Sequence, residues 1–427
     1  MPDRPGGAGA ARPLNVAAMA LGPMLSTLSR HRTAATLIVL EIALACAIVC
    51  NALFLIGNRI ATLRSASGVA EAELVTIALG GIGRQVDAAA RTREDLAALR
   101  ALPGVRNATV VNQIPFGDAA WNVGLNLTPD QEWPTLNAAQ YKAEDATLRT
   151  LGLRLIAGRD FRADEYLDLD ALRNDERLRN AGGAVILNRA AAEKMFPGQN
   201  ALGRTVYRGT VPAQVVGIVD ALARPNPDLV GPAQAPYALL IPLRMPYTDG
   251  LYVLRVRDPA QRQAVLAAAT AALMQVDSSR LVLDQQTYSE IRDAYFQGDR
   301  TMVWLLGAVC VALLVVTALG IVGLASFWVQ QRTRQIGIRR ALGATRNQIL
   351  RDFQAENFLL TSAGIALGML LAYAINQWLM GRYELPRLPL SYLPLGAATL
   401  WLLGQCAVLA PARRAAAVPP AVATRSL

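Results

Sequence analysis

Residues 331–353 read QRTRQIGIRRALGATRNQILRDF, a basic stretch between two long apolar runs. Residues 301–331 before it and residues 357–381 after it contain no charged side chain. Each run is longer than the roughly 20 apolar residues that an α-helix needs to cross a bilayer. The basic stretch is too short to be a domain, so the pattern predicts a connection on one face of a membrane.

The arginines of this connection predict its side of the membrane. The stretch holds six arginines and one acid, Asp352, and short cytoplasmic loops accumulate Lys and Arg. With two further apolar runs, the sequence predicts a membrane α-helical fold of four transmembrane helices with an inserted α+β extracytoplasmic domain. The expected order is a cytoplasmic segment 1–32, transmembrane helix 33–57, extracytoplasmic domain 58–301, transmembrane helix 302–328, cytoplasmic loop 329–354, transmembrane helix 355–380, short outer loop 381–391, transmembrane helix 392–411 and cytoplasmic tail 412–427.

The order of residues inside the cytoplasmic loop predicts a helix, a break and a second helix. Two isoleucines and Leu342 fit one face of a short helix, and Gly343 suits the left-handed position just past its end. Thr345 with Gln348 three residues later predicts a capping box for the next helix. We therefore expect a bent pair of short basic helices at the membrane surface.

Two other interpretations explain the arginines alone. A basic anchor for anionic lipid headgroups accounts for the charge but not for the order of cap and break. A DNA-binding helix-turn-helix would be tied to the membrane at both ends, which leaves it little freedom to enter a groove. The net charge of +10 follows the topology, because residues 58–301 hold 27 basic and 27 acidic residues. Membrane lipid is thus an expected partner and nucleic acid is not.

These residues resemble a known family. RTRQIGIRRALGATRNQIL (332–350), followed by Glu356 and a glycine-spaced apolar run, is similar to the permease subunits of MacB/FtsX-like ABC transporters. The tail PARRAAAVPPAVATR (411–425) and the stretches LNRAAAEKMFPGQNALGRTV and VVGIVD of the large domain also resemble that family. The resemblance implies an extracytoplasmic domain of two subdomains, one repeatedly interrupted by the other.

The resemblance also implies partners and a contact site. In that family the loop 329–354 is the coupling-helix region, which docks on separate ATP-binding subunits that hold the ATP. The implied partners are an ABC ATP-binding subunit and a second permease copy or homologue in the inner membrane, with a periplasmic adaptor left open. The residues expected to contact the ATP-binding subunit are Arg339, Arg340, Leu342, Gly343, Ala344 and Arg346.

The large domain shows both helical and strand periodicity. Thr92 with Asp95 predicts the cap of a helix that ends near Leu102, followed by a strand over residues 105–111. Further strands are expected at 184–188, 214–219, 237–243 and 251–256, and helices at 189–196 and 259–276. The charge run 164–180 interleaves acids with arginines, which predicts an exposed face rather than a metal site.

Three features concern the membrane helices. Residues 287–300 have an amphipathic pattern and continue without proline into the apolar run 302–328, which predicts one long helix leaving the domain. Gly364, Gly368 and Ala372 place small residues on one side of the third transmembrane helix, where they permit close helix packing. Glu41 lies inside the first apolar run, and we expect its side chain to face a neighbouring helix, with a functional role as the alternative.

The sequence also lacks several catalytic patterns. It has no G-x-x-x-x-G-K-[ST] phosphate loop, no G-x-S-x-G elbow, no paired Cys/His metal spacing and a single histidine. Its four cysteines all fall in apolar runs, which predicts no disulfide framework. We expect no catalytic residue, no metal and no cofactor in this chain. The expected function is a permease subunit that couples ATP hydrolysis in a partner to export or extraction of a substrate, and the alternative is a membrane-anchored extracytoplasmic sensor or regulatory protein without transport activity.

Overall fold

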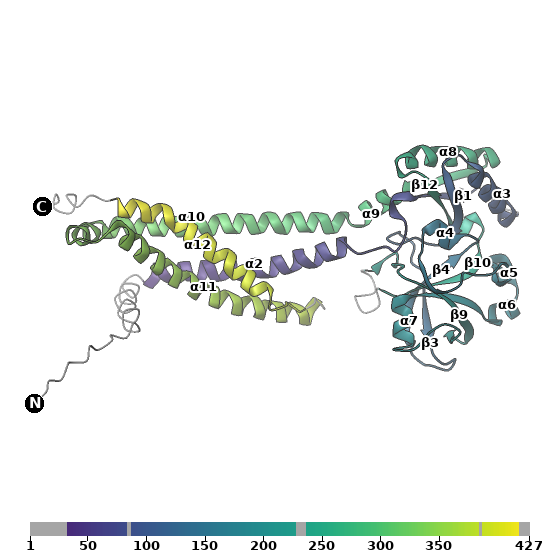
Figure 1. Ribbon diagram of the computed structural model, residues 1–427, viewed down its shortest axis with the longest axis horizontal. Helices are drawn as coiled ribbons and strands as arrows, with labels where there is room; N and C mark the ends of the chain where they lie inside the picture. The colour runs from purple at the N-terminus through teal and green to yellow at the C-terminus, as the bar shows by residue number, and fades with distance from the viewer. Residues whose placement is uncertain (1–31, 83–86, 228–235, 384–386, 418–427) are drawn as a thin grey trace, which may run out of the picture. The chain divides into compact units, whose positions relative to one another are not determined.

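The computed structural model describes residues 32–82, 87–227, 236–383 and 387–417 (Figure 1). Most of the expected N-terminal segment 1–32, residues 384–386 of the expected outer loop and residues 418–427 of the tail lie outside the described residues. The chain forms two compact units, which divide after Leu63 and again after Gly298. We call residues 64–298 the sheet unit and the rest the helical unit.

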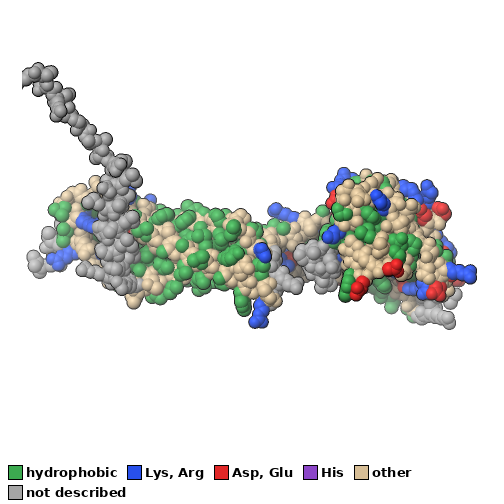
Figure 2. Space-filling view, turned by 90° about the horizontal axis from the view of Figure 1, so that it is seen from below, with side chains coloured by type: hydrophobic (Ala, Val, Ile, Leu, Met, Phe, Trp, Pro, Cys, Tyr) green, Lys and Arg blue, Asp and Glu red, His purple; other side chains and the backbone are tan. Residues whose placement is uncertain are grey.

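The described part of the helical unit consists of four long helices. They are α2 (Arg32–Leu63), α10 (Gln297–Ala341), α11 (Arg346–Tyr383) and α12 (Tyr392–Ala416), and the first two residues of α10 belong to the sheet unit. Each of the four is long and apolar enough to cross a membrane. Figure 2 shows a band of hydrophobic side chains over this unit, the surface that a lipid environment favours.

Small residues of α11 lie where this helix packs against α2. A Cβ atom at Gly364 would come within 2.7 Å of the Ile42 Cβ, and one at Gly368 within 2.5 Å of the Cys46 Cβ. Ala372 is fully buried, and its carbonyl accepts a hydrogen bond from the Asn51 amide. The backbones of the two helices therefore approach closely along this face.

Glu41 of α2 faces a third helix. A Cβ atom at Gly320 of α10 would come within 2.6 Å of the Glu41 Oε2, so the carboxylate occupies the space that this glycine leaves open. The expectation that Glu41 faces a neighbouring helix is confirmed. The four cysteines are free thiols.

The expectation of one long helix from residue 287 into the membrane run is wrong. The amphipathic segment forms α9 (Tyr288–Tyr295), which ends at Phe296, and α10 begins at Gln297. Phe296 is buried against Phe116, with ring centroids 5.0 Å apart. We attribute the end of α9 to burial of this ring. Such a tertiary contact cannot be recognised from the helical periodicity of the sequence.

The expected pair of short surface helices is also wrong in its boundaries. Residues 332–341 continue α10 without a break, and residues from Arg346 onward begin α11. Only residues 342–345 separate the two helices. The interior of this part of α10 contains no proline, so its backbone hydrogen bonds continue past the apolar run.

The sheet unit contains twelve strands among the described residues. They are β1 (Leu74–Gly81), β2 (Val105–Val111), β3 (Asn122–Asn126), β4 (Leu136–Ala143), β5 (Leu155–Gly158), β6 (Leu167–Asp168), β7 (Gly183–Asn188), β8 (Thr205–Arg208), β9 (Val211–Val219), β10 (Ala238–Arg244), β11 (Leu251–Val256) and β12 (Arg280–Thr287). Besides α9, its helices are α3 (Ala88–Ala101), α4 (Thr147–Leu151), α5 (Leu169–Asn174), α6 (Glu176–Asn180), α7 (Arg189–Met195) and α8 (Arg262–Val276). The strands and helices predicted between residues 184 and 276 are confirmed within a few residues of their ends.

The strands run in the order β12-β1-β11-β2-β4-β3-β8-β9-β7-β10-β6, with β5 on β9 and an additional pairing of β4 with β10. The strands β12, β1, β11 and β2 pair antiparallel, and β2 meets β4 at the single pair Val111 and Ala143. After β2 the chain forms β3 and β4 and then comes back through α4, which packs against β2 and β11. It next forms β5 to β10 and comes back a second time as β11. One half of the unit thus interrupts the other twice.

Helix α3 begins earlier than the sequence indicated. Its N-cap is Asp87 rather than Thr92, and both Thr92 and Asp95 are buried inside the helix. The Thr92 hydroxyl accepts a hydrogen bond from the Tyr247 backbone N–H at 2.8 Å. Thr92 therefore connects α3 to another element of the core. This contact explains why the Thr92–Asp95 pattern resembles a helix cap in the sequence but does not form one.

Candidate coupling site between α10 and α11

The turn between α10 and α11 has a defined helix C-cap. Gly343 has a φ of +99°, in the left-handed region as predicted. Its N–H donates to the Arg340 carbonyl at 3.1 Å, and the Ala344 N–H donates to the Arg339 carbonyl at 3.1 Å. These two bonds make a Schellman motif, in which the last carbonyls of a helix are satisfied by the residues that follow it.

The start of α11 is capped as well. The Thr345 N–H donates to the Gln348 Oε1 at 2.9 Å, and the Gln348 N–H donates to the Thr345 hydroxyl at 3.3 Å. The predicted capping box is thereby confirmed. Because both helix ends are capped within four residues, the turn joins α10 and α11 as a short helical hairpin.

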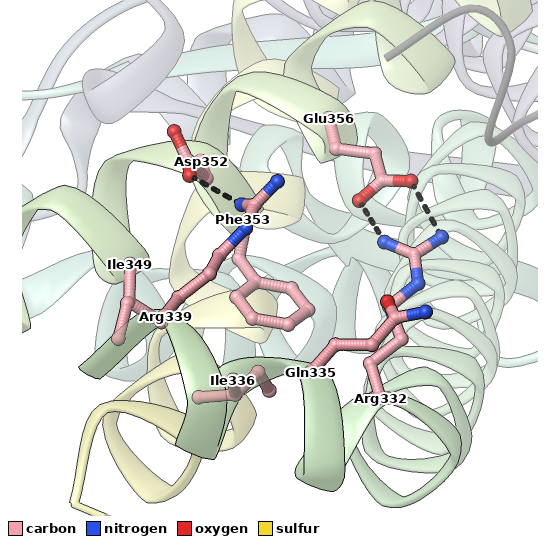
Figure 3. Close-up of a pocket in the computed structure, with 8 residues that line it drawn as sticks. All are labelled: Arg332, Gln335, Ile336, Arg339, Ile349, Asp352, Phe353 and Glu356. Atoms are coloured by element: carbon pink, nitrogen blue, oxygen red, sulfur yellow. Dashed lines mark hydrogen bonds and ion pairs between the residues drawn. The ribbon is translucent and has the colours of Figure 1, made fainter. Parts of the chain in front are cut away.

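Apolar side chains hold the two arms of this hairpin together. Ile336 of α10 and Ile349 and Phe353 of α11 are buried, in one cluster with residues of α2 and α12. Figure 3 shows them facing one another along a small groove of about 100 Å³, lined on one side by α10 and on the other by α11. The two arms are thus joined by this apolar cluster and line a common groove.

Two ion pairs cross the groove (Figure 3). Arg332 of α10 donates to both carboxylate oxygens of Glu356 of α11, at 2.9 and 3.2 Å, and both side chains are largely buried. Arg339 pairs with Asp352 at 3.4 Å, with both side chains more than half exposed. The buried bidentate pair is the stronger tie, because water and salt screen the exposed pair.

The residues predicted to contact an ATP-binding subunit gather at the tip of the hairpin. Arg339, Leu342, Gly343 and Arg346 are exposed, and Arg340 and Ala344 are partly buried. Leu342 is 84% exposed. Leu342 is thus an exposed apolar side chain at a tip that also carries the exposed arginines Arg339 and Arg346.

The sequence analysis missed the residues at the base of the hairpin. Arg332 and Glu356 lie 24 positions apart, so no helical spacing relates them. One sequence signal was available: Glu356 is an acid directly before the uncharged run 357–381. An acid at the start of a membrane-spanning run needs a partner, and the arginines at the end of the preceding run were the candidates.

Two family models match this chain. The MacB-like periplasmic core domain matches residues 33–272, and the FtsX-like permease C-terminal model matches residues 307–420. The chain belongs to the MacB/FtsX-like permease family. The second match includes the whole hairpin between α10 and α11, and the first covers most of the sheet unit. This permease is a membrane protein whose large domain is of the periplasmic α+β type.

Several curated relatives share this permease's sequence. The macrolide export ATP-binding/permease protein MacB of Agrobacterium fabrum is 27% identical over 277 residues, which cover 62% of this chain and 40% of that protein. MacB of Bradyrhizobium diazoefficiens is 31% identical over 281 residues, covering 63% of this chain and 41% of that protein. The solved periplasmic region of MacB from Actinobacillus actinomycetemcomitans has 15% sequence identity and a TM-score of 0.32, and the match covers 55% of this chain and 97% of that one.

The chain matches about two fifths of the length of these curated relatives. Their printed names combine an ATP-binding and a permease function. One of the two family models that match this chain describes a periplasmic domain and the other a permease region. The similarity between this chain and these relatives therefore concerns their permease components.

Proposed function

We propose that this chain is the permease subunit of an ABC transporter in the inner membrane. In this proposal a separate ATP-binding subunit hydrolyses ATP, and the permease itself is not an enzyme and binds no cofactor. ATP-driven movement of the partner is transmitted mechanically to the extracytoplasmic domain, where it exports or extracts a substrate. The observation that carries the proposal is the capped hairpin tip, with exposed Leu342 among arginines.

The hairpin suits a mechanical contact for a physical reason. A partner that presses on the tip displaces α10 and α11 together, because the Arg332–Glu356 pair and the apolar groove residues fix one arm against the other. A flexible loop at the same place would absorb the displacement. The sensor alternative requires no such rigid contact.

The central test is association with an ABC ATP-binding subunit co-expressed with this permease. Replacing Leu342 by Asp places a charge where the proposal expects an apolar contact, and we expect the dissociation constant to rise at least about tenfold, the effect of losing an interface hot spot. Leu281→Asp, at another exposed leucine on β12, is the matched control and leaves association unchanged. Equal binding by both variants contradicts the proposal.

A second test addresses the shape of the turn. Gly343→Val should weaken association because a β-branched residue resists a φ of +99°. Gly343→Asn is the matched control, since asparagine tolerates left-handed conformations better than other non-glycine residues. If Val and Asn variants bind alike, the contact does not depend on the capped turn.

The transmission step has its own test at the start of α10. Three glycines inserted after Gly298 cost the helix about 1 kcal/mol each relative to alanine. We expect ATPase activity of the complex to persist while transport stops, whereas three inserted alanines lengthen the same helix but keep it stiff. Equal loss of transport in both insertions would show that length, not stiffness, matters.

The topology on which the proposal depends is tested with reporter fusions. Fusions at Thr205 and Pro386 should report an extracytoplasmic location, and fusions at Thr345 and at the C terminus a cytoplasmic one. A cytoplasmic signal at Thr205 would overturn the membrane arrangement, because it would put the sheet unit and the hairpin on the same side.

A further inference from the structure

The sheet unit contains a groove that the coupling function does not use. It has a volume of about 420 Å³, and residues of β1, β11, β12, α9 and the segment 113–119 line it. These residues all belong to the sheet unit. A cavity of this size is in the range that holds small organic molecules.

One part of the groove wall is apolar and aromatic. Leu251 of β11, Ile291 and Tyr295 of α9, and Phe116 contribute to it. The Phe116 ring lies 5.3 Å from the Tyr295 ring, and its backbone has a φ of +61°. A bulky residue in the left-handed region is strained, and such strain persists where the surroundings fix the residue and is frequent at ligand sites.

The other part of the wall carries acidic and amide groups. Asp118 and Asp284 contribute two exposed carboxylates, and none of the described residues that line the groove is Lys, Arg or His. The Gln286 amide donates a hydrogen bond to Asp284 at 2.9 Å. The Gln113 side chain forms hydrogen bonds with backbone groups of Trp121 and Gln140. The two aspartates therefore set the charge of the groove.

The basic residue Arg292 of α9 contacts the aromatic part of the wall, and other groups already engage it. Arg292 stacks on the Phe116 ring, 5.1 Å from its centroid, and pairs with Glu71 at 2.8 Å. It does not line the groove. The negative charge of Asp118 and Asp284 is thus left to attract a positive group from solution.

We propose that this groove binds an organic cation with an apolar body. The cationic group is attracted to Asp118 and Asp284, and the apolar body lies against the partly exposed side chains of Leu251, Ile291 and Tyr295. Aromatic faces add to the attraction for a cation. The inference stands independently of the coupling function, because every residue it uses lies in the sheet unit.

The test measures binding of two aromatic dyes of opposite charge, ethidium as the cation and anilinonaphthalene sulfonate as the anion. The full chain is held in nanodiscs of zwitterionic phosphatidylcholine, so that lipid charge does not attract either dye. We expect ethidium to bind with a saturable fluorescence change. Each of Asp118→Asn and Asp284→Asn should weaken it about three- to fivefold, the effect of one partly screened charge contact.

Two further variants separate the groove from general surface charge. Asp130→Asn removes an exposed carboxylate that does not line the groove, and ethidium binding should not change. Ala294→Trp fills the groove from α9 and should reduce binding of the cation even though no charge is altered. Circular dichroism checks that every variant is folded.

The outcomes are decisive in both directions. Weaker ethidium binding in both aspartate variants and in Ala294→Trp, with Asp130→Asn unchanged, supports the site. Three results overturn it: no saturable ethidium binding, tighter binding of the anionic dye to the native chain, or ethidium binding that the double aspartate variant leaves intact.

Discussion

The sheet unit and the helical unit use different means to hold their elements together. In the sheet unit, strands and helices bury large aliphatic side chains around one core, and the pair Asp95–Arg280 is completely buried within it. In the helical unit, α10 exposes large apolar residues such as Trp304 and Leu319, while glycines and alanine mediate the contact of α11 with α2.

The difference reflects the solvent of each unit. In water, the transfer of apolar surface out of contact with the solvent drives formation of the core of the sheet unit. A buried ion pair is tolerated there when its hydrogen bonds are complete. Lipid tails are as apolar as leucine, so a membrane helix gains little from burying leucine and associates through close packing of small residues. Each unit should therefore respond most strongly to a different kind of substitution.

The largest expected effect is in the sheet unit, at Asp95→Ala. Arg280 donates to Asp95 at 2.5 and 3.0 Å, and Asp277 is farther away at 3.9 Å. Removing the carboxylate leaves a buried guanidinium without its main partner, so we expect a loss of about 3–5 kcal/mol in the free energy of unfolding. Hydrogen exchange of β1 and β11 in the full chain measures it. A loss below about 1 kcal/mol would mean that water reaches Arg280.

The next effect depends on pH and concerns Glu144. Burial, together with the nearby Asp145, raises the pKa of Glu144 to about 7 against the opposing effect of Arg100 and Arg244. Between about pH 4.5 and pH 7 the unfolded chain has lost this proton while the folded chain retains it, so stability falls as pH rises.

Glu144→Gln removes this titration. We expect the variant to exceed the native chain in stability by up to roughly 3 kcal/mol at pH 8 and to show no such advantage at pH 4. Unfolding of the sheet unit followed at both pH values measures the difference. Parallel pH profiles for the two proteins would show that Glu144 is not protonated in the folded state at neutral pH.

In the helical unit the predicted effect comes from a glycine. A side chain at Gly368 collides with Cys46 and with the Ala43 carbonyl, so Gly368→Leu should destabilise the α2–α11 contact by about 1–3 kcal/mol. Gly323→Leu in α10 is the matched control, because a Cβ there meets nothing within 4 Å. Thermal unfolding in detergent compares the two. Equal melting temperatures would argue against close packing at this face.

The smallest effect is expected for Asp352→Ala at the hairpin. Asp352 and Arg339 are both more than half exposed, and an exposed pair contributes within about 1 kcal/mol. We expect a change in melting temperature within error and reduced sensitivity of stability to salt. A loss as large as that at Asp95 would show that the tip is buried, for instance by a second copy of the chain.

Much of the local structure could be predicted from the sequence. The apolar runs determine four helices, because a bilayer leaves the backbone of such a run no other way to satisfy its hydrogen bonds. Gly343 and Thr345 with Gln348 were sufficient to predict the turn, since both caps depend on neighbouring residues alone. Four strands after residue 184, β7, β9, β10 and β11, were predicted as well, whereas β8 and β12 were missed.

The contacts between residues far apart in the chain were decided by the tertiary structure. Arg332 reaches Glu356 across the hairpin, and Asp95 reaches Arg280 across 185 positions. The Thr92 pattern predicted a cap, yet burial against Tyr247 assigned it to the core. Phe296 ended a helix that periodicity would have continued, because packing of its ring against Phe116 outweighs one turn of helix. Local patterns therefore determined the four long helices of this permease and the caps of the turn between α10 and α11. Its ion pairs, its groove and the end of α9 depend on contacts that form only when the chain is folded.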